Sequence, residues 1–387
     1  MGERRPSVVI VGGSTRAFAE SAARAGYKVW AVDAFGDRDL QAIATTLILT
    51  KRRGIAYTPA AAADIARLVP AAGVAYVSAL ENHAGAVERM VDGRRLWGNP
   101  PAVLRRVRDP EAMARLLAQR GIDVPAIRGG APRAPRTGRW MIKPRASGGG
   151  QDVALWRPGA PVGPARYLQE RIDGVAGSVS FVADGRRAVL LGISRQLVGE
   201  RTFGVAGFRY CGSLLAAGGA PLFGAADAAL ARAALRLASA ATDAFGLVGL
   251  NGIDFIARAG VPIPIEINPR YCASMELAER ALDQPLFALH VRACGGRLPR
   301  MSNRAGARQV FGKAIVFARR AVRVGDTDRW LADPDVRDVP HAGDRIARGR
   351  PVCTVLAAAP TAARCHRLLR RRAAAVYRAL APAGARR

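Results

Sequence analysis

Short apolar runs alternate with amphipathic segments through the first hundred residues, a pattern typical of strands and helices in turn. Strands and helices that alternate in this way form a parallel sheet with helices on both faces. Residues 1–100 therefore predict a Rossmann-like, doubly wound α/β unit. The segments expected to be regular are the strands Ser7–Gly12, Lys28–Val32 and Val74–Ser78 and the helix Arg16–Ala25.

The glycine-rich turn after the first strand imitates a dinucleotide-binding loop only in part. Gly12 and Gly13 are followed by Asp33 at the end of the second strand, but the full G-x-G-x-x-G pattern is missing. After the third strand come Glu81 and Asn82, at the sheet edge where ligands of such sheets bind. Two interpretations stay open for this pair: it contributes to a substrate site, or it caps the helix that follows.

Two apolar runs in the middle of the chain, Gly252–Ile256 and Val261–Asn268, flank a tight turn and predict a β-hairpin. Because side chains alternate along a strand, the isoleucines of the second run should share one face. Asp254 should lie roughly opposite Glu266 on the other face. Like charges in that position destabilise a sheet, so we expect a positive group between them.

The polar residues of this hairpin suit a hard divalent cation. The carboxylates of Asp254 and Glu266 and the amide oxygen of Asn268 are the ligand types that Mg²⁺, or Mn²⁺, takes alongside water and phosphate oxygens. Arg270 follows at once, and guanidinium groups commonly bind phosphate. The alternative is an edge hairpin whose outer face is merely solvated.

A second stretch combines a strand, Trp140–Pro144, with the glycine run Gly148–Gly150. Glycines let the backbone approach an anion closely and offer its N–H groups to phosphate oxygens. Lys143 would place a charge on the same phosphates. Lysine is rare here, since only four of the 59 basic residues are lysines, which makes Lys143 informative. A solvated surface loop is the alternative.

Between these stretches lies a strand, Tyr167–Glu170, that ends at the turn Asp173-Gly174. The order of lysine with glycine loop, strand with glutamate, and acidic hairpin ending Glu-Ile-Asn-Pro-Arg resembles the ATP-grasp superfamily. The resemblance covers most of the chain. It implies a Rossmann-like first domain (1–100), a two-lobed ATP-grasp domain (101–297) and a small β-rich C-terminal domain (298–387), a mixture of α/β and α+β architecture.

The resemblance also implies roles for individual residues. Lys143, Ser147 and the Gly148–Gly150 loop would cover the phosphates of ATP, and Asp254, Glu266 and Asn268 would hold the metal. Arg270, Lys143 and Arg195 would act on the transferring phosphoryl group. The adenine would meet Glu170, Arg171 and the backbone of Ile172.

At two positions the chain departs from the pattern of this superfamily. Family members commonly place a lysine near the start of the helix that opens the second domain, where this chain has Arg105, Arg106 and Arg108. We take Arg106 as the candidate for the nucleotide contact. The carboxylate that usually holds the ribose is replaced by Ala176–Ser178, so we expect a different ribose contact.

The remaining segments are predicted from their patterns. Residues 200–222 contain five glycines and predict a loop-rich section that could close over a substrate. Asp227–Phe245 has apolar residues at helical spacing, and His290 falls on a later helix where a core role is expected. The C-terminal part predicts strands at Phe311–Ala318 and Val352–Ala357 and a basic helix at Ala362–Leu380.

Composition narrows the classes of partner. A net charge of +29 favours an anionic partner, but aromatics are only 6% and no nucleic-acid motif occurs, which argues against nucleic acid. Arginine is also abundant in proteins from GC-rich genomes. The five cysteines lack metal-binding spacing. No apolar run reaches the length of a membrane span and no secretory segment is evident, so a cytoplasmic protein without a membrane partner is expected.

The function implied by the resemblance is an ATP-dependent, ADP-forming ligase. It would activate a carboxylate as an acyl phosphate and join it to an amine, or alternatively to a thiol. Both substrates would be small molecules, and an acidic, glutamate-rich substrate would suit the positive charge. The segments Gly192–Gln196 and Tyr210–Ser213 resemble bacterial ATP-grasp proteins linked to tetrahydromethanopterin- and methanofuran-type cofactor biosynthesis. A bicarbonate-activating carboxylase and a non-catalytic, arginine-rich nucleotide- or nucleic-acid-binding protein remain alternatives, and a homodimer stays open.

Overall fold

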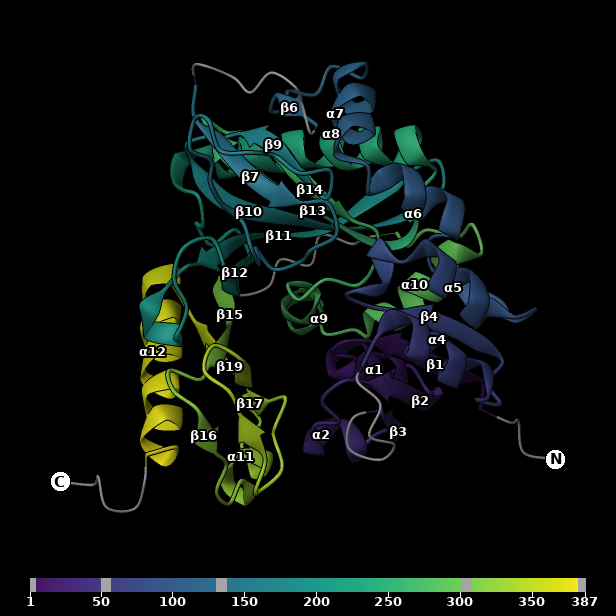
Figure 1. Cartoon of the computed structure of the whole chain (residues 1–387), viewed down its shortest axis with the longest axis vertical. Helices are drawn as coiled ribbons and strands as arrows, with labels where there is room; N and C mark the ends of the chain where they lie inside the picture. The colour runs from purple at the N-terminus through teal and green to yellow at the C-terminus, as the bar shows by residue number, and fades with distance from the viewer. Residues whose placement is uncertain (1–4, 50–56, 130–137, 301–307, 382–387) are drawn as a thin grey trace.

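The computed structural model describes residues 5–49, 57–129, 138–300 and 308–381. Its N-terminal unit is a five-stranded parallel sheet in the order β3-β2-β1-β4-β5, as the alternating pattern predicted (Figure 1). The strand order reverses between β1 and β4, which opens a crevice at their carboxyl ends. The elements are β1 (Ser7–Gly12), α1 (Arg16–Arg24), β2 (Lys28–Asp33), α2 (Arg38–Gln41), β3 (Thr45–Ile48), α4 (Pro59–Arg67), β4 (Gly73–Tyr76), α5 (Ala84–Val91) and β5 (Arg95–Trp97).

A four-stranded antiparallel sheet follows, which we call the lid sheet: β6-β9-β7-β8. Two helices lead into it, and the second begins as expected, because the Asp109 side chain accepts a hydrogen bond from the Ala112 N–H. The predicted strand around Lys143 pairs with the predicted strand that ends at Glu170. The elements are α6 (Pro101–Val107), α7 (Pro110–Ala118), β6 (Ile127–Arg128), β7 (Trp140–Pro144), β8 (Ala154–Leu155) and β9 (Arg166–Glu170).

The largest sheet has eight strands in the order β14-β13-β10-β11-β12-β15-β19-β17. Helix α8 packs on one face, while α9 and α10 pack on the other, between this sheet and the N-terminal unit (Figure 1). The elements are β10 (Val175–Asp184), β11 (Ala188–Val198), β12 (Tyr210–Ala217), α8 (Asp227–Phe245), β13 (Val248–Arg258), β14 (Val261–Asn268), α9 (Met275–Leu282), α10 (Leu286–Cys294), β15 (Gln309–Phe317), β17 (Val336–Arg337) and β19 (Pro351–Ala359).

The expectation of a loop-rich section over residues 200–222 is wrong for its central part. Residues 210–217 form β12, a strand inside the large sheet. The glycines suggested irregular backbone, but Gly212 instead allows β12 to pair closely with β15. A side chain there would bring its Cβ within 2.2 Å of the Lys313 carbonyl oxygen on β15. The two strands can therefore pair only because this position is glycine.

The C-terminal strands extend the large sheet. Strands β15, β17 and β19 add to β12, so the sheet continues across the boundary expected at residue 298. Helix α12 (Ala362–Ala379) covers them with an apolar stripe that includes Leu369 and Val376, close to the predicted helix. A small pair, β16 (Val322–Arg323) and β18 (Arg345–Ile346), completes this part. Among the described residues, no helix combines the length and apolar character that a membrane span requires.

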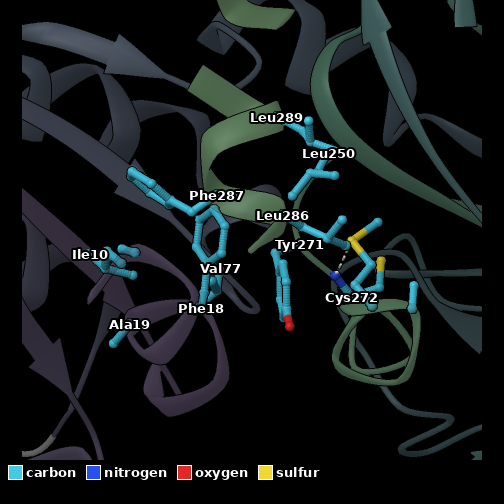
Figure 2. Close-up of a cluster of buried hydrophobic side chains, with 14 of the residues drawn as sticks. Ile10, Phe18, Ala19, Val77, Leu250, Tyr271, Cys272, Leu286, Phe287 and Leu289 are labelled. Atoms are coloured by element: carbon cyan, nitrogen blue, oxygen red, sulfur yellow. Dashed lines mark hydrogen bonds between the residues drawn. The ribbon is translucent and has the colours of Figure 1, made fainter. Parts of the chain in front are cut away.

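An aromatic cluster joins the N-terminal unit to the large sheet (Figure 2). Phe18 of α1 stacks on Tyr271 with ring centroids 4.7 Å apart and contacts Phe287 of α10 at 5.0 Å. His290 lies beside them and is buried. Its Nδ1 accepts a hydrogen bond from the Leu250 N–H at 2.8 Å, and burial lowers its pKa to about 4. It is the neutral core histidine that its helical position predicted.

A buried ionic cluster crosses the same junction. Arg16, at the start of α1 and 1% exposed, contacts Glu276 of α9 and donates to Asp338 at 2.9 Å. Glu276 also accepts from Lys313 of β15 at 2.5 Å. Burial opposes ionisation of Glu276, but the charges of Arg16 and Lys313 lower its pKa. Three parts of the chain that are distant in sequence therefore share one carboxylate.

Replacing Glu276 should reveal the energy of this cluster. Glu276→Gln leaves Lys313 buried without its counter-charge, and we expect a loss of roughly 3 kcal/mol in the free energy of unfolding. Because the folded-state pKa is lowered, the advantage of the wild type should hold above the ordinary pKa of glutamate and fall in acid. Urea denaturation across pH measures both.

The matched control is Glu88→Gln, which breaks an exposed pair with Arg105. It should cost less than about 1 kcal/mol. Equal losses in the two variants would contradict the role given to the buried cluster.

Candidate active site

The predicted hairpin is formed by β13 and β14, and Asp254 pairs with Glu266 as expected. The pairing register shifts by one residue just beyond Asp254. Ile267 pairs with Ile253 but Ile263 pairs with Ile256, so the isoleucines of β14 do not share one face, contrary to the prediction. Such a bulge re-aims a strand locally. It leaves the Ile265 carbonyl oxygen facing the lid sheet, where two side chains donate to it.

Asp254 is held by neutral donors. Gln196 of β11 donates to one of its oxygens at 2.9 Å, and the Asn268 amide donates to the other at 3.1 Å. Burial and the nearby charge of Glu266 raise the pKa of Asp254 to about 6. Its carboxylate form is therefore short of positive charge in this structure.

Glu266 is held by cations instead. The Arg108 guanidinium donates to its carboxylate at 2.6 Å, and the Lys143 ammonium lies close enough to act on it. Burial opposes the effect, but Arg108 and Lys143 together lower the pKa of Glu266. Burial lowers the pKa of Lys143, which is only 9% exposed. The positive charge expected beside the two acids is thus supplied by the side chains of Arg108 and Lys143.

The donor set fits a divalent cation in part. Two facing carboxylates, one with a raised pKa, would both gain from a metal between them. The Asn268 amide, however, turns its nitrogen towards Asp254 and its oxygen towards Arg270, so it would have to rotate to become a ligand. Within the described residues, no three acidic, histidine or cysteine side chains are grouped so that they could hold a metal. Remaining ligands would come from water and phosphate.

Lys143 connects the lid sheet to the hairpin. From β7 its ammonium donates to the Gln169 side chain at 3.1 Å and to the Ile265 carbonyl at 3.4 Å. Gln169, on the neighbouring strand β9, donates to the same carbonyl at 3.2 Å. The two bonds to the Ile265 carbonyl cross from the lid sheet to the large sheet, and they hold Lys143 beside the paired acids.

Arg108 was named beside Arg105 and Arg106 but not chosen as the nucleotide contact, and it lies at this hairpin. Besides Glu266, it donates to the Asn82 side chain at 2.9 Å and to the Ser147 carbonyl at 3.3 Å. The predicted Arg106 instead donates to the Ala244 carbonyl at 3.0 Å and lies over the Phe245 ring, so it faces α8. The available signal was position: Arg108 directly precedes the Asp109 cap, where the chain turns from α6 into α7.

The glycine loop lies closed over this site. The Ser147 carbonyl accepts from Asn82 and Arg108, and the Gly149 carbonyl accepts from the Tyr210 N–H at 3.0 Å. Gly150 has φ 71°, and a Cβ there would come within 1.9 Å of a carbonyl oxygen. A cavity of about 30 Å³ lies between Ser147 of this loop and Glu266 of the hairpin. The exposed Gly148 belongs to the same loop.

The other predicted residues lie elsewhere. Arg195 is exposed on β11, next to Gln196 in sequence and therefore on the opposite face of the sheet from Asp254. Glu170 ends β9 and accepts from the Ala126 N–H at 3.0 Å, and Arg171 pairs with Asp173. With Ile172 they lie at the end of the lid sheet, and their contact with adenine stays a prediction.

Glu81 resolves one of the open alternatives. It is 2% exposed and accepts from Arg270 at 2.7 Å and 3.0 Å, so it does not cap α5, at whose start no side chain makes a capping hydrogen bond. Burial alone would lower the pKa of Arg270, but the Glu81 charge raises it. Arg270 in turn donates to Asn268. The N-terminal unit therefore reaches the hairpin through this ion pair.

Known families and curated proteins match only part of this chain. Residues 108–274 match the ATP-grasp domain family. An uncharacterized protein of Methanocaldococcus jannaschii is 27% identical over 115 residues, which are 30% of this chain and 27% of that protein. This alignment thus spans less than a third of the length of either protein.

Solved structures match nearly the whole chain. The L-amino acid ligase from Bacillus licheniformis gives a TM-score of 0.67 at 15% identity, covering 95% of this chain and 97% of its own. The N5-carboxyaminoimidazole ribonucleotide synthetase from Thermus thermophilus gives 0.65 at 18%, covering 97% and 99%. Rhizobium etli pyruvate carboxylase gives 0.71 at 16%, covering 95% of this chain and 37% of that chain. These similarities confirm the expected fold.

The raised pKa of Asp254 predicts a measurable effect on stability. A carboxyl whose pKa rises from 3.8 to about 6 on folding favours the folded state at low pH, and this contribution is lost as pH rises through about 6. Asp254→Asn should therefore raise the free energy of unfolding above pH 6 by roughly 1 to 3 kcal/mol without metal. Thermal or urea unfolding across pH measures it.

Added Mg²⁺ should stabilise the wild type more than Asp254→Asn, which is the reverse of the order expected without metal. A cation that binds only the folded state stabilises the wild type, and Asp254→Asn should respond less. The exposed Asp243→Asn serves as the control, because its partner Arg120 is at the surface. An Asp254→Asn protein that is less stable than the wild type at pH 8 and keeps its full response to Mg²⁺ would contradict the assignment.

Proposed function

We propose that this chain, which carries an ATP-grasp domain over residues 108–274, is an ATP-dependent ligase. It activates a carboxylate as an acyl phosphate, releases ADP and joins the acyl group to an amine. The observation that carries the proposal is the pair Asp254 and Glu266, which face each other on the hairpin where the lid sheet meets the large sheet. Lys143 and Arg108 lie beside this pair. That arrangement suits the transfer of a highly charged group.

Each residue of the site has a proposed task. Lys143 and the loop from Ser147 to Gly150 bind the phosphates, and the end of β9, with Glu170, Arg171 and Ile172, receives the adenine. When bound between Asp254 and Glu266, Mg²⁺ or Mn²⁺ supplies charge neutralisation at the γ-phosphoryl group. Arg270 steadies the transferring group from the adjacent position. The closed loop excludes water, which would otherwise hydrolyse an acyl phosphate.

The acid substrate is proposed from charge alone. A glutamate-rich carboxylate suits a chain with net charge +29, and a place in one-carbon cofactor biosynthesis stays a prediction. Screening carboxylic acids and amines for paired ADP release tests the ligase and identifies both substrates. ADP release that requires neither would overturn the proposal.

Two alternatives have distinct outcomes in the same experiment. A carboxylase, a class also present among the solved structures of similar fold, would release ADP with bicarbonate and retain labelled carbon in its product. A non-catalytic nucleotide- or nucleic-acid-binding protein would release no ADP, and any binding to nucleic acid would weaken steeply with salt.

Lys143→Ala should abolish ATP turnover and leave the fold intact. The ammonium is buried and donates both to Gln169 within the lid sheet and to the Ile265 carbonyl of the hairpin, and alanine supplies neither bond nor charge there. Lys28→Ala is the matched control, because Lys28 is one of the other lysines of the chain and is exposed. Steady-state ADP release and circular dichroism give the two readouts. Near wild-type turnover in Lys143→Ala would refute the phosphate assignment.

The two carboxylates should act as a unit. If Asp254 and Glu266 hold one metal, removing the second after the first should cost little more, because the metal is already poorly held. Asp254→Asn, Glu266→Gln and the double variant are compared for turnover across a magnesium titration. Each single variant should need more Mg²⁺, and the double should be hardly worse than the poorer single. Additive losses with unchanged dependence on Mg²⁺ would exclude a shared metal.

A further inference from the structure

Arg108 uses all three of its guanidinium nitrogens in hydrogen bonds. Nε donates to the Asn82 side chain at 2.9 Å, and Nη2 donates to the Ser147 carbonyl at 3.3 Å. Nη1 donates to the Glu266 carboxylate at 2.6 Å and to the Ile267 carbonyl at 3.0 Å. One side chain therefore joins the N-terminal unit, the glycine loop (residues 147–150) and the acidic hairpin.

The ion pair with Glu266 is the strongest of these bonds. A hydrogen bond between two charged groups is shorter and roughly twice as strong as one between neutral groups. Asn82 and Ser147 offer only neutral oxygens to the same guanidinium. The Glu266 carboxylate thus anchors Arg108 in the position from which it reaches the glycine loop.

Arg108 and a divalent cation need the same carboxylate. Glu266 faces Asp254 across the hairpin, and a cation between the two acids would bind their oxygens at about 2.1 Å. Because Nη1 lies 2.6 Å from one oxygen of Glu266, the cation and the guanidinium would be within roughly 7 Å of each other. Two positive charges at that distance in a largely buried site repel each other, so each weakens the bond of the other to Glu266.

Release of Arg108 from Glu266 would also loosen the glycine loop. Within the part of the chain that the structure describes, the Ser147 carbonyl accepts from Arg108 and from Asn82, and the Asn82 side chain is itself held by Arg108. Cation binding and loop closure therefore depend on one guanidinium. By linkage, a cation on Glu266 favours the open loop, and the open loop favours the cation by the same factor.

We propose that Arg108 is a positioning residue that holds the glycine loop closed while Glu266 carries no metal, and that a divalent cation displaces Arg108 and opens the loop. The phosphate-binding loop would then stay shut until the cation needed for phosphoryl transfer is present. This consequence for the reaction rests on the proposed function, whereas the competition for Glu266 does not.

Mn²⁺ without nucleotide tests the competition, because electron paramagnetic resonance measures the free ion directly. Arg108→Gln removes the competing charge and should bind Mn²⁺ roughly tenfold more tightly than the wild type, within the range usual for coupled sites. A purely structural role for Arg108 predicts weaker binding, because loss of the residue would disorder the two acids. Weaker or equal binding in the variant, or no binding in either protein, would overturn the proposal.

Arg105→Gln is the matched control. Arg105 lies three residues earlier, on α6, and its partner Glu88 is exposed. The control should bind Mn²⁺ like the wild type, and the gain in Arg108→Gln should disappear when Glu266→Gln is added. A gain of equal size in Arg105→Gln would assign the effect to net charge, and a gain that survives Glu266→Gln would assign it to another site. Either result contradicts the competition.

Hydrogen exchange measured by mass spectrometry reports on the loop. The Tyr210 N–H donates to the Gly149 carbonyl, so its exchange depends on loop closure. Without metal, Arg108→Gln should exchange faster than the wild type at Tyr210 and over the glycine loop. Asn82→Ala removes the other donor to Ser147 and spares the ion pair, so it provides the test if Arg108→Gln does not fold. It should also exchange faster and bind Mn²⁺ about threefold more tightly. Unchanged exchange or unchanged affinity in the variant that folds contradicts the proposal.

The screen for ADP release separates this inference from the proposed function. If no pair of substrates releases ADP while Arg108→Gln still binds Mn²⁺ more tightly, the ligase proposal fails and the competition for Glu266 stands. If substrates are found while the affinity for Mn²⁺ does not rise, the ligase stands and the role given to Arg108 fails.

Discussion

The repulsion between Asp254 and Glu266 is the constraint that determines which side chains surround them. Two carboxylates paired across a hairpin destabilise it, and burial makes the cost larger. Arg108 and Lys143 approach from separate parts of the chain to offset the charge of Glu266, while Gln196 and Asn268 supply only neutral donors to Asp254. The site is therefore asymmetric, with one acid compensated and the other in need of a cation.

Buried arginines have a structural role at several junctions between segments of this molecule. Arg16, Arg108 and Arg270 are all buried or nearly so, and each links segments that are far apart in sequence through a carboxylate. A planar guanidinium can bond in several directions at once, which suits a junction where three segments meet. Part of the high arginine content thus serves the fold, and it need not signal a polyanionic partner.

Local patterns predicted most of the elements and the centre of the site. Alternation along two strands was enough to pair Asp254 with Glu266, and the rarity of lysine singled out Lys143, which does lie beside them. Arg106 faces α8 and Arg195 lies on the face of β11 opposite Asp254, placements that depend on partners distant in sequence, and the roles predicted for both stay predictions. Arg108 was named but not chosen, because its place is defined by contacts to Asn82, Ser147 and Glu266, none of which a local pattern can supply.

The closed glycine loop has a consequence for the rate at which a nucleotide can enter. The Ser147 carbonyl is held by Asn82 and Arg108 and the Gly149 carbonyl by the Tyr210 N–H, so a nucleotide that bound beneath the loop would require these bonds to break first. Association would then be gated: its observed rate should level off at high nucleotide concentration, at the rate of loop opening, and stay below the diffusion limit. Such a gate would slow the release of a bound nucleotide as much as its entry.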